Sequence, residues 1–271
     1  MNSFPRMALF SATIVLLFDS CALDDHQPVP SIQIPDCPIQ TYSVVEKSSF
    51  REGQNRDEPF QINGQDVLVG KLRSYTYQFD DQNRVIESHY IRHFASPVDR
   101  RETYEYGTDK VIHKVYDFGS SSPSLEEEIP LNAQGLWAKT GRTYDADGYL
   151  IEDTSEFGTT NYTIADGNVV RIEYRSTPGG PVSSYRTYEY DLTKPSLPNI
   201  DVTFRGKASK NLALKETNYT YSGTEPTVTS VVNFNYIDQG NGNIRRYYEF
   251  TESNVKYYAL LDYAITCQPT R

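Results

Sequence analysis

The stretch Ser74-Tyr75-Thr76-Tyr77-Gln78-Phe79 decides the expected fold. Its three aromatic residues alternate with Ser, Thr and Gln, so an extended chain would be apolar on one side and polar on the other. The same scheme returns in further runs that end at Tyr106, Tyr190 and Tyr221. Strict alternation of this kind predicts strands that pack one face against a core and expose the other face to solvent.

Turn residues follow these runs and predict hairpins. The turns at Asp145-Ala146-Asp147-Gly148 and Ala165-Asp166-Gly167-Asn168 contain Asp-Gly pairs, which tolerate positive φ. No stretch of ten or more residues has a convincing helical period. The sequence therefore predicts a single all-β domain over residues 41–271. We expect an antiparallel meander of successive hairpins that forms one large curled sheet or an open half-barrel; a closed barrel or a sandwich is the alternative.

Composition narrows the class of protein. The 271 residues include 26 Lys plus Arg and 36 Asp plus Glu, which gives a net charge of −10. With 38% hydrophobic and 23% charged residues, the chain is expected to fold rather than remain disordered. The acidic balance argues against nucleic acid as a partner, because no strip of Lys and Arg is present to neutralise phosphates. The 22 Tyr and 12 Phe suit strands with half-buried surfaces.

Residues 1–20 are predicted to be a signal peptide. Arg6 precedes an apolar run from Met7 to Phe18, which has the length of a secretory h-region and is too short to cross a bilayer. Asp19, the small residue Ser20 and then Cys21 follow, which resembles the loose lipobox of Bacteroidetes-type lipoproteins. The resemblance implies cleavage before Cys21 and lipidation of that residue by acyl chains such as palmitate, which would anchor the protein to a membrane. The alternative is an ordinary secretory signal cleaved near Ala22.

The same resemblance implies an outer-membrane lipoprotein of the cell envelope, with the periplasmic and the surface face both left open. Asp24-Asp25 resembles the acidic export tag of surface-exposed lipoproteins in that group. Residues 21–40 contain three prolines between Pro28 and Pro35, which disfavour helix and predict an extended tether.

The three cysteines suggest one disulfide. If Cys21 is lipidated, Cys37 and Cys267 remain as an even pair in an oxidising compartment. A bridge between them would close a loop of over two hundred residues, which the chain-entropy model associates with roughly 5 kcal/mol of stability. Two buried, unpaired thiols are the alternative.

One turn carries a more specific resemblance. The run Tyr144-Asp145-Ala146-Asp147-Gly148-Tyr149-Leu150 is similar to the YD repeat of Rhs-type proteins, and Phe79 to Val85 is a looser copy. In patterning, residues 70–260 resemble a YD-like β-domain of unknown function in uncharacterised Bacteroidetes lipoproteins. The resemblance implies an antiparallel meander, without the strict copies that build a closed Rhs shell.

Candidate catalytic and metal-binding residues are few. His89 and His93 would stand about 13 Å apart on a strand, too far to share one ion, so we predict no metal site and no cofactor. His113 stands alone in its strand, and Glu126-Glu127-Glu128 is predicted to be an exposed acidic loop. Nucleophile-elbow, P-loop, dinucleotide and C-x-x-C motifs are absent from the sequence, which argues against an enzyme. A carboxylate pair that meets only in space remains an alternative.

Trp137, Tyr144 and Tyr149 are the candidate ligand-binding residues, as an aromatic platform for sugar rings; the alternative is that they are ordinary core.

The leading hypothesis is an envelope-anchored, non-enzymatic lipoprotein that acts as a binding or scaffold module, with a glycan or an envelope protein as its partner. A lipid or lipoprotein carrier with an apolar concave sheet and a polysaccharide-active hydrolase are the alternatives. Aromatics beside Asn and Asp on the inner surface would favour glycan binding, a dry apolar floor would favour carriage, and two facing carboxylates about 5 to 9 Å apart would favour hydrolysis.

Overall fold

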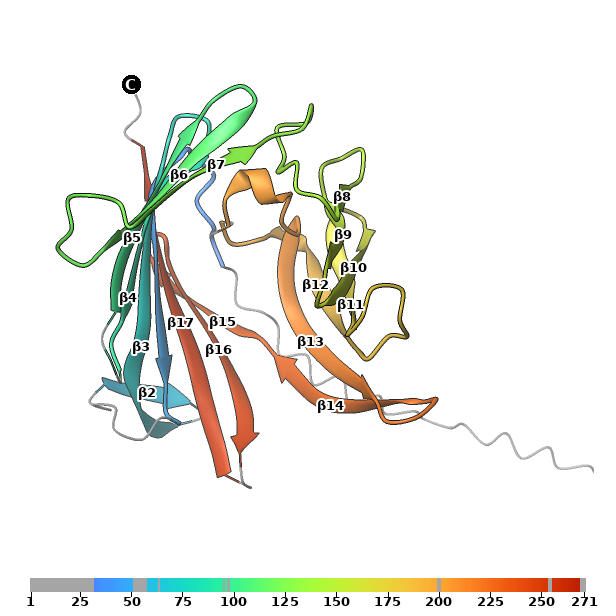
Figure 1. Ribbon diagram of the computed structural model, residues 1–271. Coiled ribbons are helices and arrows are strands. Elements are labelled where there is room, and N and C mark those ends of the chain that lie inside the picture. The colour runs from blue at the N-terminus through green and yellow to red at the C-terminus, as the bar shows by residue number, and fades with distance from the viewer. Residues whose placement is uncertain are drawn as a thin grey trace, which may run out of the picture.

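The computed structural model is almost entirely antiparallel β-structure (Figure 1). Within the described residues, the elements are β-strands and a 3₁₀ turn, η1 (Thr203–Arg205), so the predicted all-β class is confirmed. The expected signal peptide, Cys21 and the first part of the expected tether lie outside the described residues. The structure describes residues 32–50, 58–62, 64–94, 96, 98–198, 201–252 and 255–268.

The larger sheet has ten strands. They are β1 (Ile39–Ser48), β2 (Glu58–Ile62), β3 (Gln65–Phe79), β4 (Val85–Arg92), β5 (Val98–Tyr106), β6 (Lys110–Asp117), β7 (Leu125–Pro130), β15 (Asn235–Gly240), β16 (Asn243–Glu252) and β17 (Val255–Cys267). Their order is β15-β16-β17-β1-β3-β4-β5-β6-β7, with β2 paired to β3. Neighbours along the chain are mostly neighbours in the sheet, as expected for a meander, and β17 returns to pair with β1.

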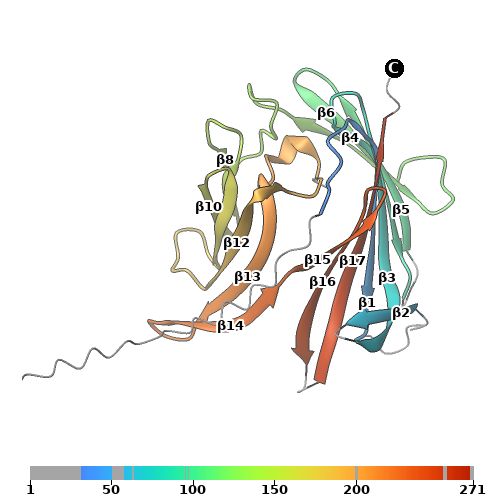
Figure 2. The same ribbon diagram turned by 180° about the vertical axis from the view of Figure 1, so that it is seen from behind.

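The smaller sheet has seven strands in the simple order β14-β13-β12-β11-β10-β9-β8. They are β8 (Arg142–Tyr144), β9 (Leu150–Ser155), β10 (Gly158–Ala165), β11 (Asn168–Arg175), β12 (Ser184–Pro195), β13 (Asn211–Tyr221) and β14 (Pro226–Asn233). The two sheets lie opposite one another and diverge from the end that holds η1 (Figures 1 and 2). The predicted meander of hairpins is therefore present, but it is divided between two open sheets and is not closed into a barrel.

The division has a structural cause at Phe234. This residue alone separates β14 from β15, and its backbone N–H donates to the carbonyl of Leu214 at 2.8 Å. One extended segment thus pairs with β13 along its first half and with β16 along its second half. The other junction is the connection of residues 131–141, which follows Pro130 at the end of β7. Pro130 has no N–H to donate, and one residue later the Leu131 N–H donates to the Asp109 carbonyl at 2.7 Å before the chain leaves the larger sheet.

The main core lies between the sheets at the end that η1 occupies (Figure 1). Phe204 of η1 is 1% exposed, and its ring centroid lies 6.1 Å from that of Tyr104 and 6.4 Å from that of Trp137. Tyr42 and Leu212 bring the two sheets into the same cluster. Because Phe204 packs in the cluster that both sheets share, the loop that carries η1 helps to hold the sheets together. Burial of a side chain of this size stabilises the fold by about 2 kcal/mol.

A smaller cluster lies where the β2–β3 hairpin covers the outer face of the larger sheet, and it contains Phe60, Val69 and Leu260. Beside it, the ammonium of Lys47, a residue 6% exposed, lies 2.6 Å from carboxylate oxygens of both Glu58 and Asp262. A buried Lys requires such partners, because an unpaired ammonium in this position would carry a large desolvation penalty.

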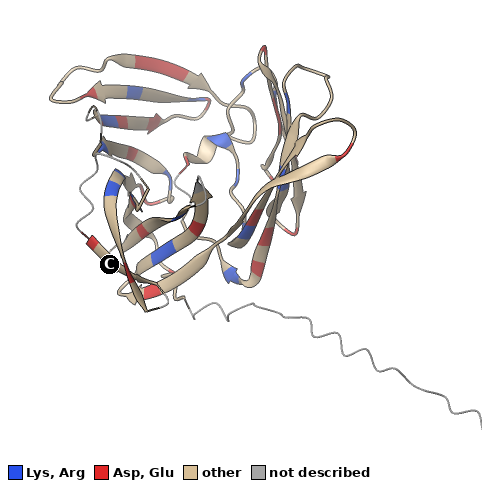
Figure 3. Cartoon of the chain, turned by 90° about the horizontal axis from the view of Figure 1, so that it is seen from below, with Lys and Arg blue, Asp and Glu red and all other residues tan. Residues whose placement is uncertain are grey.

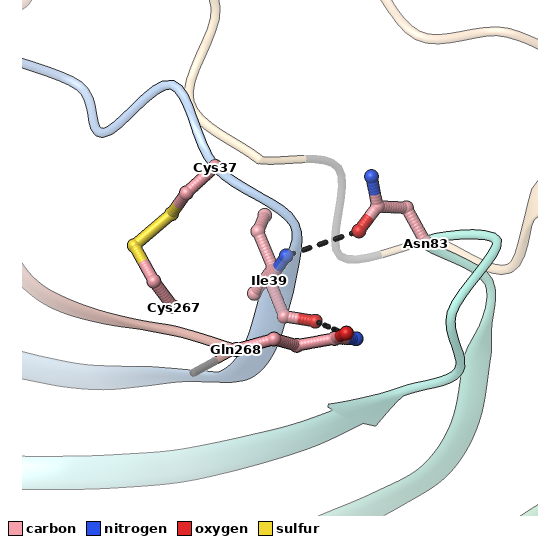
Figure 4. The surroundings of a disulfide bond; sticks show 5 residues. All are labelled: Cys37, Ile39, Asn83, Cys267 and Gln268. Carbon is pink, nitrogen blue, oxygen red and sulfur yellow. Dashed lines mark hydrogen bonds between the residues drawn. A yellow bond between two sulfur atoms is a disulfide. The ribbon is translucent and has the colours of Figure 1, made fainter. Parts of the chain in front are cut away.

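The two ends of the described chain meet at a disulfide. Cys37 and Cys267 are bonded, with their Cα atoms 5.8 Å apart, which confirms the predicted bridge (Figure 4). Beside the bond, the Ile39 N–H donates to the side chain of Asn83 at 3.0 Å, and the side chain of Gln268 donates to the Ile39 carbonyl at 3.3 Å. The bridge therefore fastens the pairing of β1 with β17.

Residues 32–40, within the segment expected to be a tether, belong to the folded body. Ile32 is 5% exposed in the main core, and the Gln33 N–H donates to Asp238 at 2.9 Å. Cys37 is disulfide-bonded, and β1 begins at Ile39. Across the described part of the chain, no helix combines the length and the apolar character that a membrane span requires.

Candidate ligand-binding site

Tyrosine and arginine side chains share the face of the larger sheet that is turned toward the smaller one. Val44 lies in the core between the sheets, and the register places Tyr75, Tyr90 and Arg100 in the same row across β3, β4 and β5. Residues directly opposite one another in a sheet point to the same side. This inner face is therefore polar and aromatic beyond the core, rather than a dry apolar floor.

The facing side of the smaller sheet has the same character. Glu216 of β13 marks this side: burial first, and then carboxylates that include Glu216, raise the pKa of Tyr248 of β16, whose ring contacts Phe234 beside the core. Arg186 of β12 lies on the same side, because its guanidinium is 3.8 Å from the Glu216 carboxylate, and Asn218 of β13 lies opposite Arg186. Arg186 in turn lies opposite Ile172, and Ile172 opposite Tyr162. Seen from below, both signs of charge are distributed over the strands (Figure 3).

A cavity of about 460 Å³ opens at one end of the smaller sheet. Asp153 of β9, Thr160 of β10 and Tyr174 of β11 form one row of its lining, since the register pairs Asp153 with Thr160 and Thr160 with Tyr174. Phe157, at the tip of the β9–β10 turn, is 81% exposed. The lining residues are Lys139, Asp153, Ser155, Phe157, Gly158, Thr159, Thr160, Tyr174, Arg175, Ser176 and Ser183.

Two glycines allow the strands around the cavity to approach closely. A Cβ at Gly158, where φ is +140°, would lie 2.0 Å from the carbonyl oxygen of Arg175. A Cβ at Gly141, where φ is +86°, would lie 2.2 Å from the carbonyl oxygen of Thr154. Neither distance is compatible with a side chain, so glycine is required at both positions.

The charges at the cavity favour a ligand with an acidic group. Asp153 accepts two hydrogen bonds from the guanidinium of Arg142, at 3.0 and 2.7 Å, so its charge is already balanced. Arg175 is held at the rim by the Gly180 carbonyl at 2.7 Å. Within the described residues, Lys139 has no carboxylate at salt-bridge distance, which leaves a net positive charge at the site of a chain whose total charge is −10.

The structure places the three predicted platform residues in different surroundings. Trp137 packs against Phe204, and the guanidinium of Arg142 lies 4.5 Å from the centroid of its ring. Tyr144 follows Arg142 along β8, and burial raises the pKa of its hydroxyl. Tyr149 instead donates to the carbonyl of Gly167 at 3.1 Å, on the neighbouring hairpin.

None of the three predicted platform residues lines the cavity; Trp137 lies next to it, because Arg142 contacts both the Trp137 ring and the lining residue Asp153. Arg142 connects Trp137 to Asp153, and Lys139, whose ammonium lies 5.3 Å from the centroid of the Trp137 ring, is part of the lining. Sequence reasoning missed Phe157 and Tyr174 as the aromatic residues of the cavity. Phe157 follows Glu156 and precedes Gly158, and an apolar residue beside a turn glycine was the available signal.

A second cluster lies on the inner face of the larger sheet. His113, expected to stand alone, is hydrogen-bonded through both ring nitrogens: Nδ1 lies 2.9 Å from Glu127 and Nε2 lies 3.0 Å from Glu102. Its ring stacks on Tyr104, with centroids 4.9 Å apart, and the Tyr104 hydroxyl donates to Glu102 at 2.7 Å. The imidazole stands between the two carboxylates, so it occupies the space that a substrate of a carboxylate pair would need.

The acidic run that was predicted to be a loop is part of this cluster. Glu126-Glu127-Glu128 lies in strand β7, where Glu127 is opposite His113, so the loop prediction is wrong although the residues are exposed. Of the other histidines, His26 lies outside the described residues, the His89 side chain contacts Asp99, and the His93 side chain contacts Ser74. Within the described residues, no group of three or more His, Cys, Asp or Glu side chains could hold a metal ion.

Comparison with known proteins gives distant similarities. No protein-family model matches the chain, and no curated protein is similar to it in sequence. A porin-like protein from Bacteroides uniformis is similar in structure over 87% of this chain and 99% of its own, at 13% identity and a TM-score of 0.48. A transferrin-binding protein B variant from Haemophilus parasuis matches 89% of this chain and 79% of its own, at 10% identity and a TM-score of 0.13.

Proposed function

We propose that the protein is a non-enzymatic binding module of the cell envelope, and that the cavity on the smaller sheet binds a saccharide with an acidic group. The observation that carries the proposal is the exposed ring of Phe157 beside a polar cavity lined by Tyr174, Arg175 and Lys139. An aromatic ring offers a flat apolar surface to the C–H face of a sugar, and neighbouring polar groups hydrogen-bond its hydroxyls. The free charge of Lys139 would pair with a carboxylate.

The facing surfaces of the sheets support this proposal over a lipid carrier. An acyl chain needs a continuous apolar lining, whereas Arg100 and Arg186 lie in the rows that face across the space between the sheets. Arg100 lies 3.0 Å from Glu102 and Arg186 lies 3.8 Å from Glu216, and an acyl chain would remove water from these charged pairs without offering them a polar contact. A hydrolase of the carboxylate-pair type is also disfavoured at Glu102 and Glu127, because His113 is bonded to both.

Replacement of Phe157 by Ala is expected to weaken saccharide binding about fivefold, because loss of one aromatic stacking contact costs about 1 kcal/mol. Isothermal titration calorimetry with galacturonate oligosaccharides measures the change, and galactose oligosaccharides of equal length provide the neutral comparison. The matched control is Phe118→Ala, since Phe118 is also 81% exposed but lies in the turn that follows β6. The proposal fails if neither oligosaccharide binds, or if the two variants weaken binding equally.

We propose further that the protein is anchored to the outer membrane through acyl chains on Cys21. The support is the sequence: an apolar run of h-region length is followed by Asp19, the small residue Ser20 and Cys21. Two or more acyl chains give a stable anchor, because each buried CH₂ contributes about 0.8 kcal/mol.

Replacement of Cys21 by Ser is expected to move most of the protein from the membrane fraction to the soluble fraction without unfolding it. The expectation follows because Ser offers no thiol to the acyl donor. Ala22→Ser, which keeps the thiol, is the matched control and is expected to stay bound after a carbonate wash. A Cys21→Ser protein that sediments with membranes as the parent does would contradict the acyl anchor.

A further inference from the structure

Among the strands that the structure describes, five pair on one side only: β2, β7, β8, β14 and β15. Four of these free edges carry features that oppose pairing with another chain. β7 bears Glu126–Glu128 and ends at Pro130, β2 contains Pro59, and β8 has three residues. On β15, Asp238 accepts from the backbone N–H of Gln33. Charges, prolines, short length and covering segments are the usual protections of an edge strand.

β14 carries no charge and no internal proline, and its one irregularity is the extra residue between Val228 and Ser230. Its eight residues, Pro226–Asn233, carry no charge, and the single proline stands at the first position. Val228 is 51% exposed and Val231 is 47% exposed. A long, uncharged edge with exposed β-branched residues is a template for addition of another strand.

We propose that β14 is a self-association surface, at which β14 of one copy pairs antiparallel with β14 of a second copy. The two-fold axis lies between Thr229 and Ser230. Val228 of each copy then lies opposite Val231 of the other. Such an isologous contact uses the same surface twice and closes after two copies, which yields a dimer rather than a fibre.

The register of β14 against β13 supports this axis. Val228 lies opposite Tyr219, and Val231 lies opposite Thr217, although the two valines are three residues apart. The irregularity between them adds one residue, so both valines point to the same face of the sheet. Pairing about the proposed axis therefore brings four valines together on that face, where cross-strand β-branched pairs are favourable.

The absence of charge on β14 selects a second copy of this chain as the occupant. Each copy carries a net charge of −10, so most contacts between copies are repulsive. Pairing of β7 with a second β7 would bring glutamates such as Glu127 close to one another. Pairing through β14 brings no carboxylate opposite another, and the side-chain pattern is complementary to itself under the two-fold rotation.

Disulfide cross-linking tests the proposed register. In a Cys21→Ser background the remaining cysteines form the Cys37–Cys267 bond, so added thiols are the free ones. Val228→Cys and Val231→Cys proteins are oxidised separately and as an equimolar mixture. We expect at least tenfold more covalent dimer in the mixture, because each new thiol lies opposite the other position and not opposite itself. Equal yields in the three samples, or no dimer in the mixture, would overturn the proposal.

Sedimentation velocity provides an independent measurement in solution. The weight-average sedimentation coefficient of the Cys21→Ser parent is expected to rise with concentration. Val231→Lys should abolish the rise, because it places like charges on both sides of the pairing. Val255→Lys, at a residue 49% exposed at the start of β17, is the matched control and should behave as the parent does. If the two lysine variants associate equally, β14 is not the contact.

Discussion

Loss of the Cys37–Cys267 bond is expected to lower the free energy of unfolding by about 3–5 kcal/mol. The bond joins residues separated by 230 positions, so in the unfolded state it restricts nearly the whole described chain. In the folded state β1 and β17 remain paired without it, from Ile39 opposite Cys267 to Ser48 opposite Ala259. The Cys37→Ala/Cys267→Ala protein should therefore fold, with a lower urea midpoint than the parent.

Two measurements check this expectation. Urea unfolding compares the double variant with the parent, both in a Cys21→Ser background so that no other thiol is present. A free-thiol assay on the unfolded, non-reduced parent should find no reactive sulfhydryl. Equal urea midpoints would show that the loop closure does not contribute, and detection of two thiols would show that the bond does not form in the mature protein.

Local features of the chain could be predicted from sequence because their causes are local. The turn after Tyr144 is an example: Asp145 accepts from the backbone N–H of Tyr149 at 2.8 Å, and Gly148 has a φ of 89°. Side-chain capping by Asp and positive φ at Gly are properties of the residue types themselves. Alternation likewise predicted the inward position of Tyr77, which lies in the core between the sheets, and of Tyr75, which packs against that core.

Features that depend on register or on distant packing could not be predicted in this way. The split between the sheets occurs at Phe234, an apolar residue within an alternating run that gives no sign of a change of partner. The isolated His113 acquires Glu102 and Glu127 from strands on both sides, which requires knowledge of both registers. The cavity needs three strand ends and a distant Lys139 to converge, and no single stretch of sequence contains that arrangement.

The ionic cluster around His113 is expected to make stability depend on pH in both directions. Hydrogen bonding to Glu102, and then to Glu127, raises the pKa of His113. The hydrogen bond from His113 is the largest cause that lowers the pKa of Glu102, to about 2. The imidazolium and the carboxylates therefore stabilise one another, and the His113 side chain is 9% exposed, which limits screening by solvent.

The two shifts act over different pH ranges. Because the pKa of His113 is raised on folding, its contribution is complete below about pH 6.5 and is lost as the pH rises through the folded-state value. Because the pKa of Glu102 is lowered, its contribution is complete above the ordinary carboxyl range near pH 4.5 and is lost as the pH falls toward 2. The stabilisation from this cluster should therefore be greatest between about pH 4.5 and 6.5.

Replacement of His113 by Phe is expected to lower the free energy of unfolding by about 3 kcal/mol near pH 6, because it leaves Glu102 without its main ionic partner. Phe retains a ring that can stack on Tyr104, so the change removes charge and hydrogen bonds more than packing volume. Urea unfolding between pH 3 and 9 should show a flatter pH profile for the variant than for the parent. His93→Phe, at an exposed histidine bonded to Ser74, is the matched control and should leave the profile unchanged.

NMR titration of the parent gives the decisive result. An imidazole of His113 that titrates at or below pH 6.5 would show that the two carboxylates do not hold its proton. The cluster would then contribute no such pH dependence to the free energy of unfolding.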